Sequence, residues 1–372
     1  MVETSEVVIV GGGAAGCAVA YYLARSGVKA TIIEGQGVAS QASGYAAGLL
    51  NPLQGHGIPG PMGAFAWESY ELHLRLWEDL REETGLDFQG RTISSIRVAF
   101  EEADFSDMED TLALFSATDG FEARWLNARE VHELDPRITP NAVGGLYSRG
   151  SAGVDSYQYT MALAEAAKKQ GAVIRQDKVC GLEHSDGRVT GVKLEDGMVS
   201  CDWVVLAMGP WSRQAEPWLG MYIPVDPLKG EILRFDLPAP ALGYDLSGGG
   251  GSLYAKPGGQ VWCGLTEEWK GFDRQATESA RRSILESAVI LIPELAHAPL
   301  VMHTACLRPV TPDWLPILGR APGYENVYLA TGAGKKGILL SPGMGKGIAD
   351  LITKGDTDLA IGAFDPQRFT NP

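Results

Sequence analysis

The glycine motif GxGxxG at residues 11–16 constrains the fold more than any other feature of the chain. It follows residues 6–10 (EVVIV), a β-branched apolar run that is typical of a buried parallel strand. Residues 14–26 then predict a helix, and residues 29–34 (KATIIE) predict a second strand. We therefore expect the chain to open with a compact strand–helix–strand unit.

Each glycine of this motif has its own physical role. Gly11 permits a tight turn, Gly13 lets the backbone approach a pyrophosphate, and Gly16 lets the helix pack closely on the strand. The helix N-terminus adds free N–H groups and the positive end of the helix dipole. Glu34 ends the second strand 18 residues after Gly16, where an acidic side chain holds ribose hydroxyls. These features predict a dinucleotide site, but they do not separate FAD from a nicotinamide cofactor.

The stretch from Val7 to Ala24 carries no charge and is as long as a transmembrane helix. Because it contains four glycines, we predict a strand, a turn and a helix there, and no membrane span. The net charge of −15 argues against nucleic acid and anionic membranes as partners. We expect a cytoplasmic protein without a metal site, because the N-terminus lacks a basic signal region and the five cysteines form no Cys-x-x-Cys pattern.

Periodicity and turn residues predict the later elements. Helices are expected at residues 65–84, 157–170, 277–292 and 343–353. Short strands are expected around the Asp186-Gly187 and Asp196-Gly197 turns, over residues 222–270 and over residues 326–331. The polar residues 101–110 predict a surface excursion.

Four later segments resemble the FAD-contacting parts of the D-amino-acid oxidase superfamily. They are residues 40–50 (SQASGYAAGLL), 202–210 (DWVVLAMGP), 306–319 (CLRPVTPDWLPILG) and 326–347. The order and spacing of these segments are specific to the superfamily. Within it, the chain is most similar to glycine oxidase-like and sarcosine oxidase-like proteins, and residues 55–150 match least.

The resemblance implies an α/β fold in which a Rossmann-type FAD-binding domain is interleaved with an α+β substrate domain built on an antiparallel sheet. The length of 372 residues is sufficient for two domains. We expect a discontinuous FAD-binding domain at residues 1–60, 150–215 and 320–360. The substrate-binding domain is expected at residues 61–149 and 216–319.

The resemblance also implies which residues contact FAD. They are Gly11, Gly13, Ala14, Ala15, Gly16, Glu34, Gln41, Ala42, Ser43, Ala46, Ala47, Gly48, Leu49, Val179, Ala207, Gly209, Trp211, Gly332, Gly334, Lys336, Gly337 and Ile338.

Three residues are expected to be catalytic. The resemblance gives Arg308 the role of holding the substrate carboxylate, for which a guanidinium offers a bidentate fork; the alternative is a structural salt bridge. Tyr254 matches an active-site tyrosine of the family, with an ordinary strand tyrosine as the alternative. Lys335, beside Lys336, lies in the flavin loop, where glycine oxidase-like proteins more often have His-x-Arg. A cation there would stabilise anionic reduced flavin, whereas one of the two lysines can instead point to solvent.

Cys306 raises the question of how the cofactor is attached. Its position resembles that of the cysteine that carries flavin covalently in monomeric sarcosine oxidase. Glycine oxidase-like proteins hold FAD noncovalently, and a free cysteine is commonly a small apolar filler. We expect noncovalent FAD, with a covalent link through Cys306 as the alternative.

The sequence thus predicts an FAD-dependent oxidoreductase that oxidises the C–N bond of a small amino acid or secondary amine, such as glycine, a D-amino acid or sarcosine. The expected steps are hydride transfer to flavin N5, hydrolysis of the imine, and reoxidation by O2 or another acceptor. The alternatives are an FAD-dependent 2-hydroxy-acid dehydrogenase, a nicotinamide-dependent dehydrogenase, and a flavin-binding subunit of a larger complex.

Overall fold

The computed structural model describes residues 3–185, 187–264 and 266–370, and the chain forms two compact units. The first unit comprises Met1–Phe88, Val154–Leu228 and Leu307–Pro372. The second comprises Gln89–Gly153 and Lys229–Cys306. The chain passes from one unit to the other after residues 88, 153, 228 and 306. The domain boundaries expected from the sequence follow residues 60, 149, 215 and 319. The functional division into an FAD domain and a substrate domain stays a prediction.

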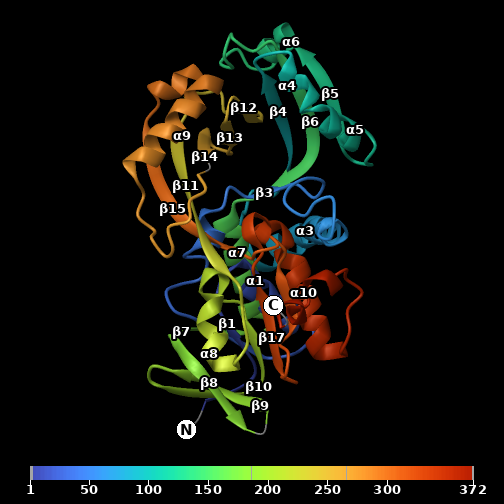
Figure 1. Cartoon of the computed structure of the whole chain (residues 1–372), viewed down its shortest axis with the longest axis vertical. Helices are drawn as coiled ribbons and strands as arrows, with labels where there is room; N and C mark the ends of the chain where they lie inside the picture. The colour runs from blue at the N-terminus through green and yellow to red at the C-terminus, as the bar shows by residue number, and fades with distance from the viewer. Residues whose placement is uncertain (1–2, 186, 265, 371–372) are drawn as a thin grey trace. The chain divides into compact units, whose positions relative to one another are not determined.

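The first unit is built on a mostly parallel sheet. Its strands lie in the order β16 (Ile317–Arg320), β17 (Val327–Thr331), β10 (Gly197–Leu206), β1 (Glu3–Val10), β2 (Ala30–Glu34) and β7 (Val173–Gln176). β8 (Val179–Ser185) pairs with β9 (Arg188–Leu194), which pairs with β10. Figure 1 shows β17, β10 and β1 side by side. Among the described strands of the central path, β16 alone runs antiparallel to its neighbour.

Both faces of this sheet are covered, which explains its continuous apolar strands. On β1, Val8 and Val10 pack in a core cluster with residues of β8, β9 and β10. Val7 and Ile9 point to the opposite face and are also fully buried. The βαβ unit expected from the glycine motif is confirmed, because β1 and β2 pair in parallel through α1 (Ala14–Arg25).

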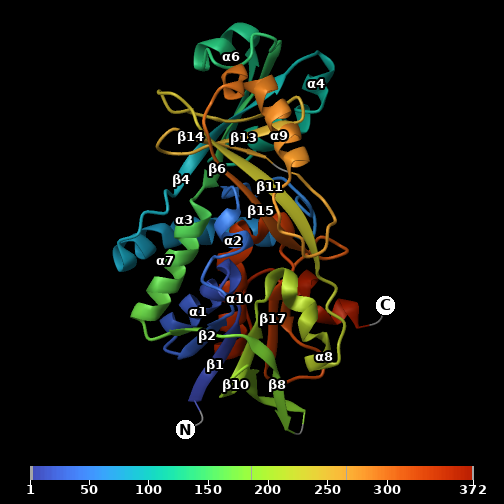
Figure 2. The same ribbon diagram turned by 90° about the vertical axis from the view of Figure 1, so that its left-hand side faces the viewer.

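The long helices of the first unit pack against one another. They are α1, α3 (Gly63–Thr84), α7 (Ser156–Lys169) and α10 (Gly337–Lys354), and the short helices are α2 (Ala42–Tyr45) and α8 (Glu216–Leu219). Figure 2 shows α1 and α10 next to the sheet, with α7 beside α1. α10 approaches α1 closely because it lacks a side chain at Gly345, where a Cβ atom would lie 2.5 Å from the backbone of Ala18.

The second unit is a mostly antiparallel sheet with helices. The strand order is β15 (Leu300–Val310), β11 (Asp226–Asp236), β14 (Gln260–Gly264), β13 (Gly251–Ala255), β12 (Asp245–Gly248), β4 (Arg91–Ala99) and β6 (Gly144–Gly153), with β5 (Glu122–Asn127) paired to β6. Its helices are α4 (Ala103–Ser106), α5 (Glu109–Ser116), α6 (Ala128–Leu134) and α9 (Glu278–Leu291). α9 packs on the sheet through Ile284, Ala288 and Leu291. The α/β fold with an interleaved antiparallel sheet is therefore confirmed.

Most of the elements expected from periodicity are present. α3, α7 and α9 match their expected ranges closely, and the turn at Asp196-Gly197 joins the antiparallel strands β9 and β10. Asp186 of the other expected turn lies outside the described residues. Residues 101–110 are largely exposed, as expected of a surface excursion, and contain α4 and the start of α5. One expectation was wrong, because the last helix begins at Gly337 instead of residue 343.

Candidate active site

The N-terminus of α1 is the best-defined part of the candidate site. Gly11 has a φ of +110°, and a Cβ atom there would lie 2.4 Å from the carbonyl oxygen of Ala207. A Cβ atom at Gly16 would lie 2.0 Å from the carbonyl oxygen of Gly11. Gly13 differs, because its Cβ atom would meet only the Oγ of Ser43, at 3.2 Å. Two glycines are therefore required by packing, while the third leaves space above the helix end.

Glu34 lies at the end of β2 and faces the glycine turn. Its Oε2 accepts a hydrogen bond from the amide of Gly12 at 2.7 Å, and its Oε1 accepts one from the amide of Gln36 at 2.9 Å. The carboxylate is thus held at the carboxyl end of a parallel strand, beside the helix N-terminus. Each oxygen keeps a further lone pair, so the group can still accept hydrogen bonds from a ligand hydroxyl.

The segment from Ser40 to Gly48 lies over the same helix end. Ser43 contacts the helix directly, since its Oγ accepts a hydrogen bond from the amide of Ala14 at 2.9 Å. The Oγ of Ser156 donates to the carbonyl oxygen of Ala46 at 2.7 Å, and so ties the segment to α7. Gly48 has a φ of +80° and meets Val154, whose carbonyl oxygen would lie 2.0 Å from a Cβ atom. The expected contact segment is therefore rigidly attached within the first unit.

The turn after β10 is fixed to the end of β17. The Oγ of Ser212 lies 2.6 Å from the Oγ1 of Thr331, and both hydroxyls bond the carbonyl oxygen of Gly209. Trp211 lies within this turn and is half-buried. The amide of Ala207 donates to the carbonyl oxygen of Val10, which places the turn beside the glycine motif.

Arg308 lies close to the loop that precedes α10. It is buried, with an exposed fraction of 8%, on the part of β15 that belongs to the first unit. Val310, two residues later, forms a β-bridge with Ala333 of that loop. A Cβ atom at Gly332 would lie 2.7 Å from the Cγ2 of Thr311, so the loop and the segment after β15 are in close contact. A buried arginine beside this loop can present its guanidinium to an anionic ligand.

The two lysines of the loop have different surroundings. Lys335 is exposed, and its Nζ lies 3.3 Å from the Nε2 of His56, whose ring stacks on Trp314 at 4.1 Å. Lys336 instead donates from Nζ to the carbonyl oxygens of Asn51, at 3.1 Å, and Gln54, at 2.6 Å. Burial and the neighbouring charge of Lys335 lower the pKa of Lys336 to about 8. Lys336 therefore anchors the segment 51–57 through backbone carbonyls.

Tyr254 and Cys306 belong to the second unit. Tyr254 on β13 pairs across the sheet with Trp262 on β14. Arg234 lies opposite Trp262 on β11 and places its guanidinium carbon 3.8 Å from the indole centroid. Cys306 is buried with an exposed fraction of 7%. The sequence had predicted Tyr254, but no sequence pattern pointed to Arg234, which stacks on Trp262.

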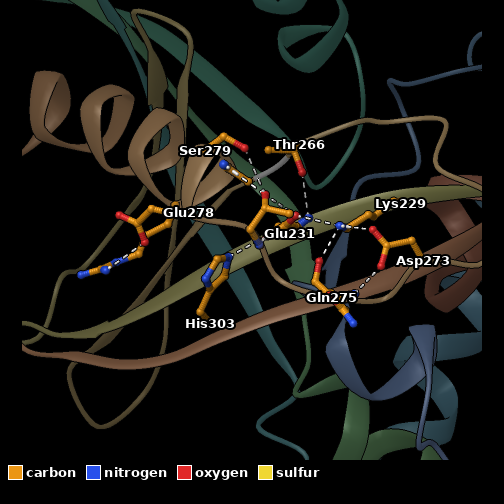
Figure 3. A network of polar contacts seen from close by, with 11 residues as sticks. Lys229, Glu231, Thr266, Asp273, Gln275, Glu278, Ser279 and His303 are labelled. Carbon is orange, nitrogen blue, oxygen red and sulfur yellow. Dashed lines mark hydrogen bonds and ion pairs between the residues drawn. The ribbon is translucent and has the colours of Figure 1, made fainter.

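The second unit also contains a buried charge network, drawn in Figure 3. Lys229 and Glu231 have no exposed side-chain surface, and the Lys229 Nζ lies 3.2 Å from the Glu231 Oε1. Lys229 also contacts Asp273 at 3.2 Å, and Glu231 contacts the Nε2 of His303 at 2.8 Å. Glu231 further accepts two hydrogen bonds from Thr277, the N-cap residue of α9. These contacts attach residues 266–277 to the sheet, and sequence reasoning missed them.

Comparisons with known proteins identify the family. A family model described as "FAD dependent oxidoreductase" matches residues 6–351. The chain belongs to this family of FAD-dependent oxidoreductases. A glycine oxidase from Geobacillus kaustophilus (strain HTA426) is 30% identical, over 99% of this chain and 98% of the relative. A hydrogen cyanide synthase subunit, HcnC, from Pseudomonas protegens is also 30% identical, over 99% of this chain and 97% of the relative. The crystal structure of a glycine oxidase from Geobacillus kaustophilus superposes with a TM-score of 0.91 at 28% identity, and covers 100% of this chain and 99% of that one.

The residues of the first unit fit the FAD that this family uses. No side chain caps α1 at Gly13, and its first turn carries no acidic residue, so the positive helix end is open to a pyrophosphate. The Oγ of Ser40 is buried without a hydrogen-bond partner among the described residues, as expected of a group that a ligand satisfies. The described residues contain no cluster of three or more side chains that could hold a metal. None of the described helices is long and apolar enough to cross a membrane.

Proposed function

We propose that this FAD-dependent oxidoreductase oxidises the C–N bond of a small amino acid or secondary amine that carries a carboxylate, such as glycine, a D-amino acid or sarcosine. The observation that carries the proposal is a buried arginine, Arg308, beside the loop that leads into α10. The glycine oxidases among the relatives support the same substrate class. FAD would be held noncovalently, and the covalent link through Cys306 stays the alternative prediction.

The cofactor residues act by binding and orientation. The amides at the N-terminus of α1 would hold the pyrophosphate, and Glu34 would accept hydrogen bonds from ribose hydroxyls. The backbones of residues 41–49, 207–211 and 332–338 would hold the rest of the cofactor, together with Val179. FAD, when bound, supplies an acceptor for the hydride and passes the electrons to O2 or another acceptor.

The substrate residues fix the geometry of the reacting carbon. Arg308 would bind the substrate carboxylate through two parallel N–H donors, which orients the α C–H bond. The substrate amine must be neutral, so that its lone pair assists the departure of the hydride. Lys335 would add positive charge on the flavin side, and Tyr254 would bond the carboxylate or line the pocket. The product imine then hydrolyses in water.

The proposed function is tested by an anaerobic screen of amines and amino acids against the purified holoenzyme. The expected result is bleaching of the flavin absorption band at about 450 nm by an amine that carries a carboxylate. Bleaching by 2-hydroxy acids and not by amines would overturn the proposal in favour of a hydroxy-acid dehydrogenase. The relative named as a subunit favours one further candidate, a flavin-binding subunit. Absence of bleaching by any small amine, together with tight binding of a partner chain, would support that candidate.

Replacing Arg308 tests the role of the carboxylate. Loss of the partner of a buried charge costs several kcal/mol, so Arg308→Ala should lower kcat/KM by roughly a hundred- to several-thousand-fold. The loss should be confined to substrates with a carboxylate, and the FAD content should stay unchanged. Arg320→Ala is the matched control, because Arg320 is an exposed arginine of the same unit. An equal loss on an amine without a carboxylate would mean that Arg308 is structural.

A further inference from the structure

α10 contains a proline where its backbone needs a donor. In an α-helix, the N–H of each residue bonds the carbonyl oxygen four residues earlier, so residue 342 should bond Ile338. Pro342 lies inside α10 and has no N–H. Ile338 is buried, with an exposed fraction of 6%, so water cannot easily replace the missing donor. The carbonyl oxygen of Ile338 therefore needs side-chain donors in place of the missing backbone N–H.

His73 of α3 supplies one of these donors from a distant part of the sequence. Its ring is fully buried, and its Nε2 lies 2.8 Å from the carbonyl oxygen of Ile338. Because a carbonyl oxygen only accepts, Nε2 must carry the hydrogen, and Nδ1 carries none. Nδ1 accordingly has no hydrogen-bond partner among the described residues. The Oγ of Ser341 is the second donor to Ile338, at 2.8 Å.

The position of His73 is fixed by tight packing of three helices. Its ring lies 4.8 Å from the ring of Tyr159 on α7, and the hydroxyl of Tyr159 lies 3.4 Å from the Oγ of Ser341 on α10. One turn before His73, the Oγ of Ser69 would lie 2.2 Å from a Cβ atom at Gly343. α3 and α10 therefore come together closely around the imidazole, which has little freedom to move away from Ile338.

We propose that neutral His73, in its Nε2–H tautomer, is a positioning residue for residues 332–338. This inference rests on the proposed function, which assigns Gly332, Gly334, Gly337 and Ile338 to cofactor contact. The β-bridge between Val310 and Ala333 fixes the start of this segment, and the hydrogen bond from His73 fixes its end. His73 would act through the backbone of Ile338, and it is not among the residues expected to contact substrate or cofactor.

Two substitutions of His73 separate the hydrogen bond from the packing. His73→Leu replaces the imidazole with an apolar side chain of similar bulk and removes the hydrogen-bond donor. His73→Gln keeps an N–H donor near the position of Nε2. Pro342→Ala provides the second test, because an alanine at this position restores the backbone N–H that the helix lacks. Leu80→Ala is the control for lost stability alone, since Leu80 is fully buried on α3, two turns beyond His73.

The readouts are local amide exchange in the holoenzyme and retention of FAD. In His73→Leu, the amides of residues 337–345 should exchange about tenfold faster, and the dissociation constant for FAD should rise about tenfold, the factor that corresponds to one lost buried hydrogen bond. The visible circular dichroism of the flavin should change as well. His73→Gln should stay within about threefold of the wild type. The double variant His73→Leu/Pro342→Ala should recover most of the loss.

The outcomes either support the proposal or overturn it. If His73→Leu retains FAD and slow exchange in residues 337–345, His73 is only a packing residue. The same conclusion follows if Leu80→Ala changes the flavin spectrum equally, or if the double variant remains as impaired as the single one. If His73→Leu does not fold, His73→Gln and the double variant still decide. The readouts require no turnover, so a failed search for an amine substrate leaves them unaffected.

Discussion

At the scale of single residues, the three glycines of the motif are required for different reasons. Gly11 and Gly16 have no room for a methyl group, because a Cβ atom would meet backbone oxygens at 2.4 and 2.0 Å. Gly13 has room for one, since only the Oγ of Ser43 lies near, at 3.2 Å. Gly13 therefore leaves space above the helix end, where we expect the pyrophosphate of FAD to bind.

This difference predicts distinct outcomes for two substitutions. Gly13→Val should give a folded protein with little or no FAD, because the branched side chain occupies the approach to the helix end. Gly16→Ala should instead lower the melting temperature, since the backbone of Gly11 cannot move away from the new methyl group. Flavin absorbance per protein and thermal unfolding measure the two effects. A Gly13→Val protein that is fully loaded with FAD would contradict the assignment of the motif.

Candidate site residues could be predicted from the sequence where they belong to a local motif. The glycines and Glu34 occupy fixed places in a strand–turn–helix unit, so spacing alone located them. The environment of Lys336 had no such signal, because its ammonium bonds the carbonyl oxygens of Asn51 and Gln54, 282 to 285 residues away. The same holds for His73 and Ile338, which are separated by 265 residues. Contacts between distant segments depend on tertiary packing, which the periodicity of the sequence does not reveal.

At the scale of elements, the buried pair Lys229–Glu231 joins a strand, a loop and a helix. β11 carries both residues, residues 266–277 provide Asp273 and Thr277, and α9 begins directly after Thr277. Figure 3 shows Lys229 and Asp273 directed toward one another. Because both members of the pair are fully buried, removal of one leaves a charge without its partner in the interior.

We expect Glu231→Leu to lower the free energy of unfolding by about 3 kcal/mol, because the buried Lys229 then keeps only the partly exposed Asp273 as an ionic partner. Lys229→Met/Glu231→Leu should cost less than the single change, since no charge is stranded. Residues 266–277 should become sensitive to limited proteolysis in the single variant. Glu195→Leu is the control, because its pair with Lys178 is exposed and should contribute little to stability. Equal effects of the buried and exposed substitutions, measured by denaturant unfolding, would refute this account.

The start of α10 illustrates why element boundaries were only partly predictable. A proline disrupts the interior of a helix, so the sequence favoured a helix that starts after Pro342, from residue 343 onward. The structure begins the helix six residues earlier, at Gly337. Gly345 and Gly343 permit close approach to α1 and α3, and His73 replaces the donor that Pro342 lacks. Tertiary contacts therefore stabilise a turn that local propensity disfavours.

At the scale of the whole molecule, the residues that we expect to contact the cofactor come from three separate stretches that assemble in the first unit. Parallel pairing of β1 with β10 and of β10 with β17 joins strands that are far apart in the sequence. Alternation and turn residues predicted the individual strands, but strand order is not encoded in a local pattern. The interleaving was expected only because four segments resemble a known superfamily, whose family model then matched residues 6–351.

The stability of the molecule in acid should report directly on His73. Burial lowers the pKa of His73 from 6.5 to about 4, against the opposing effect of the backbone groups of Ile338 and Leu339. The titratable group of α7 that contacts the imidazole of His73 is Tyr159. Burial raises the pKa of Tyr159, so its phenol stays neutral. α10 faces the imidazole with a backbone carbonyl group. Among the described residues, no charged side chain is a cause of the shift in the pKa of His73.

The sign of the effect follows from proton binding. Between pH 6.5 and about 4 the unfolded chain binds a proton at His73 and the folded chain does not, so stability falls as the pH falls through this window. The full loss amounts to roughly 3 kcal/mol, and it is absent above pH 6.5. His73→Gln cannot titrate, so the free energy of unfolding of this variant should gain roughly 3 kcal/mol relative to the wild type between about pH 7 and pH 4. Carboxylates that titrate in the same range cancel in this comparison, because both proteins contain them. Parallel curves for the two proteins across the window would show that the buried imidazole is protonated as readily as in the unfolded chain, and would contradict the lowered pKa of His73.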